Sequence, residues 1–236
     1  MNKGAIVDGI KKAKRLLKKA DINYSENTSF PHDYLLPNKL SDEFIRVSQE
    51  KEYDTIHKIA LSNGDYDILL DDYSFFQFTQ DSVGVLRYAF YQSAREIPTY
   101  DSFMESIGFS KEDYNQDIEE ERPFSNDYEQ IISEANLSNS VTPIRYDYNK
   151  KQYQRIIHPI SHLHIGHDND VRIPMNIILT PQAFVAFVIR HVYYKHWKLA
   201  IVNQEFQKEY LSIKNTCMNI EIEDFDVDEQ KDLFLI

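Results

Sequence analysis

Cysteine, glycine and long apolar runs are all scarce in this sequence. Its 236 residues contain one cysteine, Cys217, which excludes an intramolecular disulfide and a cysteine-cluster metal site. No apolar stretch approaches the length of a membrane span, and no signal peptide is visible. The single thiol and the missing apolar stretch together predict a cytoplasmic protein without a membrane partner.

Basic residues are outnumbered, and the formal net charge is −12. This balance argues against nonspecific nucleic-acid binding by the whole surface, but a local basic patch is still compatible with a nuclease. Residues 1–20 carry seven basic side chains and one acidic one, so the remainder has a net charge of −18. Such charge segregation is typical of a protein that docks on an acidic or basic partner.

Aromatic residues are abundant, with sixteen tyrosines and fourteen phenylalanines against six glycines, which favours antiparallel strands. The sequence predicts a single α+β domain over residues 1–236, in which an antiparallel β-meander packs against a long C-terminal helix over residues 180–210. We expect the other helices at 5–20, at 41–62 and in an acidic insertion at 99–138, and strands at 66–71, 73–80, 83–94, 144–148 and 152–157. Residues 25–40 are expected to form an ordered loop.

The C-terminal residues 221–236 form an acidic tail with an apolar tip. Seven acids and one lysine lie between Glu221 and Asp232. The tail is expected to pack as a terminal strand, to fold back on the basic helix at residues 5–20, or to contact a partner protein.

Histidines are concentrated in one short run that ends at Gly166. His162 and His164 alternate with Leu163 and Ile165, so on a strand both imidazoles project from one face, about 7 Å apart. His158 has the same parity, although Pro159 predicts an edge or a bend. We therefore expect these histidines on one face of a half-buried strand.

Paired imidazoles on one face suit two chemistries. His162 and His164, with His158, are candidate metal ligands for one divalent ion. Without a metal, the same three residues are candidate general acid and base groups, and Arg172 would bind a phosphate. Structural histidines hydrogen-bonded within a sheet are the alternative.

Other residues were assigned supporting roles around this run. Asp147 is expected to orient one imidazole. Arg190, His191 and Tyr148 are candidate substrate contacts. The spacing from Arg190 to His196 resembles the arginine–histidine signature of HEPN ribonucleases, whose all-helical fold conflicts with the strands predicted here.

The motif His-Pro-Ile-Ser-His-Leu-His-Ile-Gly at residues 158–166, followed by Arg172-Ile173-Pro174 and Leu179-Thr180-Pro181, resembles a motif of an uncharacterised bacterial domain-of-unknown-function family. About ten of its residues are also similar to the signature of TumE-like toxins. The latter resemblance implies a toxin or phage-defence effector that cleaves RNA, with His162 and His164 at the matching positions. A metal-dependent hydrolase and a non-catalytic interaction subunit or antitoxin-like partner remain the alternatives.

Overall fold

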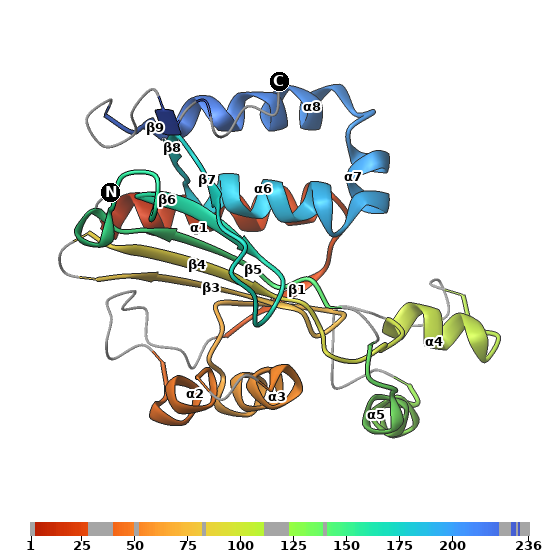
Figure 1. The fold of residues 1–236 in the computed structure, drawn as a ribbon. Helices are drawn as coiled ribbons and strands as arrows, with labels where there is room; N and C mark the ends of the chain where they lie inside the picture. The colour runs from red at the N-terminus through yellow and green to blue at the C-terminus, as the bar shows by residue number, and fades with distance from the viewer. Residues whose placement is uncertain are drawn as a thin grey trace.

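A single antiparallel sheet organises the protein (Figure 1). The computed structural model describes residues 3–27, 40–49, 52–81, 84–110, 123–138, 141–221, 228–229 and 231. Within these residues, strands β1 to β7 each pair with the next strand along the chain. Their bounds are Tyr24–Glu26, Ile68–Leu70, Phe75–Gln80, Leu86–Tyr91, Ile144–Tyr148, Ser161–Ile165 and Ile173–Pro174. The predicted α+β class with a β-meander is confirmed.

One face of the sheet is covered by helices α1 (Lys3–Lys19) and α6 (Pro181–His191), which lie side by side in Figure 1. Alternate strand residues such as Phe78, Tyr88 and Tyr146 point to this face and pack with Phe184 of α6 into the main core. The contact between the two helices is close at Gly9, where an added Cβ would lie 2.6 Å from the Pro181 ring. Burial of this apolar layer is the main source of stability.

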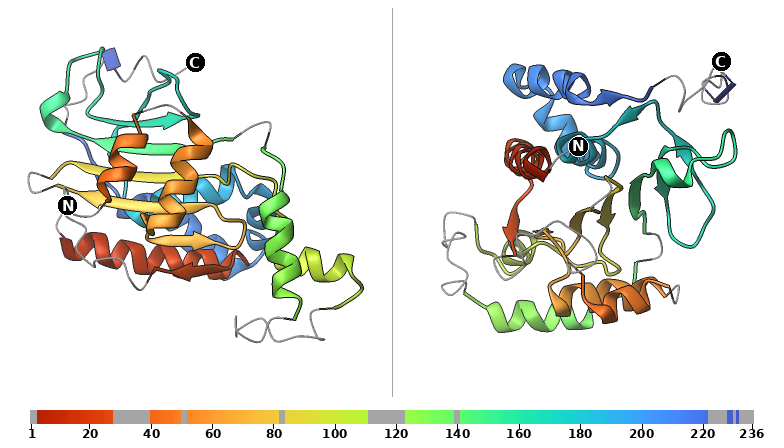
Figure 2. Two further views of the ribbon diagram at one scale, coloured as in Figure 1. Left: turned by 90° about the horizontal axis from the view of Figure 1, so that it is seen from below. Right: turned by 90° about the vertical axis from the view of Figure 1, so that its left-hand side faces the viewer.

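The opposite face carries helices α2 (Asp42–Val47) and α3 (Tyr53–Asn63), seen in front of the strands in the left panel of Figure 2. A smaller core of Phe44, Val47, Ile56 and Ala60 joins both helices to Phe75 of β3. Helices α4 (Tyr100–Ser106) and α5 (Ser125–Glu134) pack against each other beside the sheet. Helices α2 and α3 pack on the apolar part of this face, around Phe75, and a cleft lies between them and the polar residues of β3 to β6.

The long helix predicted at residues 180–210 is instead three helices: α6, α7 (Tyr194–Ala200) and α8 (Gln204–Ser212). Thr180 caps α6 as predicted, by accepting a hydrogen bond from Ala183 N–H at 3.2 Å. Asn203 starts α8 in the same way. The turns let Phe206 pack back on the core, whereas one straight helix would extend past the sheet.

The helix predicted at residues 41–62 is also divided, into α2 and α3. The residues between them, 48–52, are all polar and have no apolar stripe to bury, which explains the break. The strand predicted at 152–157 is not formed: residues 150–152 make a short 3₁₀ helix, and the chain then turns to bridge Gln154 with His158. Conversely, β1 overlaps the start of the loop predicted at residues 25–40, and residues 28–39 of that loop lie outside the described residues.

Two described residues of the acidic tail, Asp228 and Glu229, contact the segment between β5 and β6. Glu229 is 3% exposed, and its carboxylate accepts hydrogen bonds from the Tyr153 hydroxyl at 3.0 Å and from Ile156 N–H at 3.1 Å. Asp228 pairs with Arg155. The tail therefore stabilises the turn that precedes the histidine strand. Most of the remaining tail residues, and residues 111–122 of the acidic insertion, lie outside the described residues.

None of the helices in the described residues has both the length and the apolar character that crossing a membrane requires. Strands β8 (Ile177–Ile178) and β9 (Met218–Asn219) form a separate two-stranded pair that ties the C-terminal helices to the chain ahead of α6.

Candidate functional site

A cleft of about 860 Å³ lies between the sheet and helices α2 and α3. Two adjacent cross-strand rows on β3 to β6 lie on this face of the sheet, and most of their residues form the floor of the cleft. One row is Gln77, Ala89, Arg145 and His164, and the neighbouring row is Thr79, Arg87, Asp147 and His162. Strand alternation places both rows on the face opposite the main core. Polar and charged side chains therefore gather on one half-covered face.

His162 is held at the bottom of this face and is 2% exposed. Its Nδ1 lies 2.9 Å from the main-chain oxygen of Pro159. Because a carbonyl oxygen only accepts, Nδ1 must carry the hydrogen, and Nε2 of the neutral ring then has a free lone pair. Burial lowers the pKa of His162 to about 4; the adjacent His164 and His158 add to the shift, while the Asp147 carboxylate opposes it. The ring is thus neutral at pH 7.

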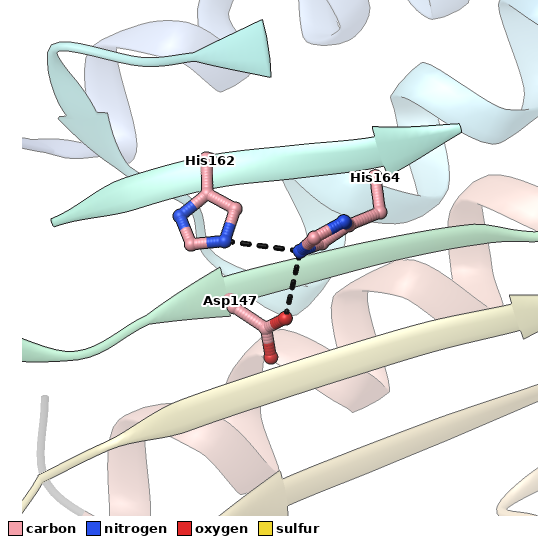
Figure 3. Close-up of side chains that lie close together, drawn as sticks. All are labelled: Asp147, His162 and His164. Atoms are coloured by element: carbon pink, nitrogen blue, oxygen red, sulfur yellow. Dashed lines mark hydrogen bonds and ion pairs between the residues drawn. The ribbon is translucent and has the colours of Figure 1, made fainter. Parts of the chain in front are cut away.

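His164 connects the buried ring to the cleft. Its Nε2 lies 3.0 Å from Nε2 of His162 and 3.4 Å from an oxygen of Asp147, as Figure 3 shows. The ring centroids of the two histidines are 4.8 Å apart. This distance is shorter than the about 7 Å that separates alternate residues along an ideal strand, so the two rings lean towards each other. His164 lines the cleft, whereas His162 and Asp147 do not. Of the two clustered histidines, His164 is therefore the one that a ligand in the cleft can reach, and His167 lines the same cleft outside the cluster.

Asp147 is the acidic residue of the cluster and is flanked by two guanidinium groups. Arg87 Nε donates to one carboxylate oxygen at 2.9 Å and Arg145 Nε donates to the other at 2.7 Å. Burial acts to raise the pKa of Asp147, but the hydrogen bond from His164 and the two arginine charges outweigh it and hold that pKa well below its usual range. Asp147 is therefore ionised at neutral pH and able to orient His164.

The same three side chains could hold a metal ion. One ligand atom from each of Asp147, His162 and His164 lies within 4.8 Å of the others. The Pro159 carbonyl fixes the His162 ring through Nδ1, an arrangement typical of metal-ligating histidines. Two histidines and one carboxylate form a common ligand set for catalytic zinc and related metals, with a further position open to water or substrate.

The structure brings together some of the predicted site residues. His158 lies edge-on to His162, with ring centroids 5.0 Å apart, and its buried Nδ1 has no hydrogen-bond partner among the described residues. Asp147 lies beside His164, as the sequence suggested. Three of the four residues predicted to be catalytic, together with the carboxylate expected to orient them, therefore form one cluster.

The other predicted residues lie elsewhere. Arg172 is exposed before β7 and does not line the cleft. Tyr148 points to the opposite face of the sheet and joins the main core, because its parity is that of Tyr146. Arg190 and His191 are the last two residues of α6. Arg190 lies over the Trp197 ring of α7 and His191 packs against Phe187, so neither faces the histidine strand. These residues are not parts of the cluster.

Arg87 and Arg145, and not Arg172, are the arginines that lie beside the cluster. Both line the cleft, and their side chains are 56% and 43% exposed. Alternation in the segment Ile144 to Tyr148 places Arg145 on the same face as Asp147. The sequence pattern alone could therefore have identified Arg145 as a neighbour of the cluster. Arg87 is sixty residues from Asp147 in the sequence, and only the strand register brings the two together.

Fold and site together define an α+β protein with a seven-stranded antiparallel sheet, within the described residues, and a histidine–aspartate–arginine cluster in a cleft on one face. The chain belongs to the DUF2290 family of uncharacterized conserved proteins, whose model matches residues 24–228. The match covers strands β1 to β9 and the whole cluster. No match was found among curated proteins or solved structures.

Proposed function

We propose that this protein cleaves RNA in the cleft above strands β3 to β6. The observation that carries the proposal is the placement of two half-exposed guanidinium groups, Arg87 and Arg145, directly beside the Asp147–His164–His162 cluster. Arginine binds phosphate through several N–H groups at once, and each of these arginines uses its Nε–H for Asp147. The terminal N–H groups are then available for the phosphate of a substrate.

In the proposed reaction the 2′-hydroxyl of a ribose attacks the adjacent phosphorus and the bond from phosphorus to the 5′-oxygen breaks. The products are a 2′,3′-cyclic phosphate and a 5′-hydroxyl. The phosphate cannot lie between the two rings, because their Nε2 atoms are only 3.0 Å apart. We therefore assign proton exchange with the substrate to His164, which lines the cleft.

His162 would act by positioning His164. With a pKa of about 4 the buried His162 ring stays neutral, and its Nε2 would accept the hydrogen of His164 Nε2. The proton from the 2′-hydroxyl would enter the other ring nitrogen of His164, and the Asp147 carboxylate beside this ring would stabilise the charge. His164 would then give a proton to the leaving 5′-oxygen, so that the enzyme ends unchanged. Arg87 and Arg145 would stabilise the charge that develops on the phosphate.

The resemblance of the motif at residues 158–166 to TumE-like toxins supports RNA as the substrate and a role as a toxin or phage-defence effector. Inertness of the purified protein towards RNA would favour the alternative of an interaction subunit.

The test is cleavage of an end-labelled RNA by purified wild-type protein and by the variants His164→Ala, His162→Ala and Arg145→Ala. We expect each variant to lose at least about 100-fold in rate, the usual size of a general acid–base or charge-stabilising contribution. The matched control is His191→Ala on α6, which should cleave at the wild-type rate. Full cleavage by the His162→Ala/His164→Ala double variant would overturn the proposal.

A second candidate is a metal-dependent hydrolase, favoured by the convergence of ligand atoms from Asp147, His162 and His164 within 4.8 Å. One divalent ion there would activate water or polarise a phosphate. Titration of zinc or manganese into chelator-treated protein separates the candidates. Stoichiometric binding that His162→Ala abolishes, together with cleavage that requires added metal, would support the hydrolase. Cleavage that persists in chelator would support the metal-free reaction.

A further inference from the structure

The floor of the cleft has a depression at Ala89, in the middle of strand β4. Ala89 lies between Gln77 on β3 and Arg145 on β5 in its cross-strand row, and between Arg87 and Tyr91 on the same face of its own strand. All four neighbours are much larger than alanine. The side chain of Ala89 therefore lies at the bottom of the cleft, with the larger side chains around it.

The side of the cleft above this depression is apolar. Phe44 and Ile45 of α2 and Ile56 of α3 line it, and Tyr91 closes the end of the floor. Ile45 is 38% exposed and adds apolar surface to this side of the cleft. The cleft thus combines an apolar side under α2 with a polar side that contains the two arginines and His164, and Asp168 and Asp170 of the segment after β6 also line it.

Gln77 adds a fixed polar group at the edge of the depression. Its Nε2 donates to the main-chain oxygen of Asp65, which orients the amide and leaves its Oε1 as an acceptor. Gln77 is buried and lines the cleft. A rigid carbonyl acceptor beside an apolar hollow is suited to the amino edge of a heterocyclic base.

We propose that the depression over Ala89 binds the base of an unpaired nucleotide whose phosphate lies on Arg87 and Arg145. The inference deepens the proposed RNA cleavage and rests on it for the identity of the polymer. Arg145 is one strand from Ala89 and His164 is two strands away, about 5 Å and 10 Å respectively. These spacings are of the order that separates a base from its own 3′-phosphate.

The guanidinium groups also suit a base as a neighbour. Planar arginine groups stack on nucleobases, and single-stranded RNA is generally bound by splaying a base against aromatic or guanidinium planes. A paired base would bring its partner strand beneath α2, where Phe44 and Ile45 present apolar surface to a charged backbone. The cleft volume of about 860 Å³ lies in the range of small-ligand sites. The site is therefore suited to one unpaired nucleotide.

The experiment compares the binding of nucleoside 3′-monophosphates with that of inorganic phosphate to the full chain by calorimetry. Wild-type protein is expected to bind a nucleotide at least tenfold more tightly than phosphate. In Ala89→Leu, which fills the depression, that ratio should fall to near one, while the affinity for phosphate changes less than twofold. Retained phosphate binding also shows that this variant is folded.

Ile45→Ser provides a second variant at a partly exposed position, where misfolding is not expected. It should lower the ratio of nucleotide to phosphate affinity by removing part of the apolar wall. Equal affinities in the wild type, or an unchanged ratio in both variants, would overturn the base site.

RNA cleavage by the same proteins separates this inference from the proposed function. Nucleotide binding with the expected Ala89→Leu effect but without RNA cleavage would leave the base site standing and remove the nuclease. RNA cleavage that Ala89→Leu leaves at the wild-type rate would remove the base site and leave the nuclease.

Discussion

The buried ring of His162 makes the stability of this protein depend on pH in a defined window. The folded protein holds the pKa of His162 at about 4, mainly through burial, whereas an exposed histidine has a pKa of about 6.5. Between these two values the unfolded chain binds a proton that the folded chain does not. Unfolding is therefore favoured as the pH falls through this window, and the loss is small above pH 6.5.

The magnitude follows from the two pKa values. Lowering the pH from about 7.5 to about 5.0 should reduce the free energy of unfolding by about 2 kcal/mol through His162 alone. For a chain of this size, that corresponds to a fall in Tm of about 4–8 °C. The perturbation that isolates the effect is His162→Asn, since asparagine can still donate to the Pro159 oxygen but does not titrate.

The assay is urea unfolding of the wild type and His162→Asn at both pH values, in the presence of a chelator. The variant is expected to be less stable at pH 7.5, but to lose about 2 kcal/mol less than the wild type on acidification. Titrating groups that do not interact with His162 cancel in the comparison because both proteins share them. Equal losses in the two proteins, or an NMR titration midpoint of His162 near its ordinary value, would refute the argument.

Three further predictions concern packing, the tail and the charge cluster. Gly9→Ala should destabilise the protein by about 1–3 kcal/mol in urea unfolding, because the new methyl group meets the Pro181 ring. The control Gly4→Ala, in the exposed first turn of α1, should not destabilise it, and equal effects of the two substitutions would contradict this packing. Glu229→Ala should cost about 1–3 kcal/mol by leaving two donors without their acceptor, and an unchanged urea midpoint would contradict that. Asp147→Asn should tighten the binding of inorganic phosphate several-fold in calorimetry, by removing the negative charge between the two arginines, while lowering RNA cleavage at least about 100-fold. Weaker phosphate binding would contradict the assignment of the arginines.

Alternation in the sequence was sufficient to predict the face of the histidines. His162 and His164 project from the same side of β6, and Leu163 packs in the main core as expected. The Thr180–Pro181 start of α6 was confirmed for the same kind of local reason, since a cap and a first-turn proline act within one turn. Local patterns were therefore sufficient for β6 and for the start of α6.

The composition of the cluster was not predictable in the same way. Arg87 contacts Asp147 only because β4 and β5 pair in a register that joins residues on either side of the acidic insertion. Nothing local to either strand specifies that register, because it depends on turn lengths and on packing against α6. Arg172 was nearer in sequence to the histidines, yet the chain turns away from the cleft before β7.

The predicted helix ends were wrong where tertiary packing determines them. Residues 180–210 have helical propensity throughout, but the breaks before Tyr194 and at Asn203 allow Phe206 to return to the core. The sequence contained the Asn203 cap, although a capping residue inside a continuous helical pattern is easily outweighed in prediction.

The nature of the RNA products tests the central claim most directly. Wild-type protein in chelator, incubated with a short RNA of defined sequence, should release fragments that end in a 2′,3′-cyclic phosphate with a matching 5′-hydroxyl, as identified by mass spectrometry. His164→Ala should release none, and His191→Ala should release the same fragments as the wild type. RNA that remains intact with the wild type, with or without added divalent metal, would contradict the assignment of this cleft as a ribonuclease site.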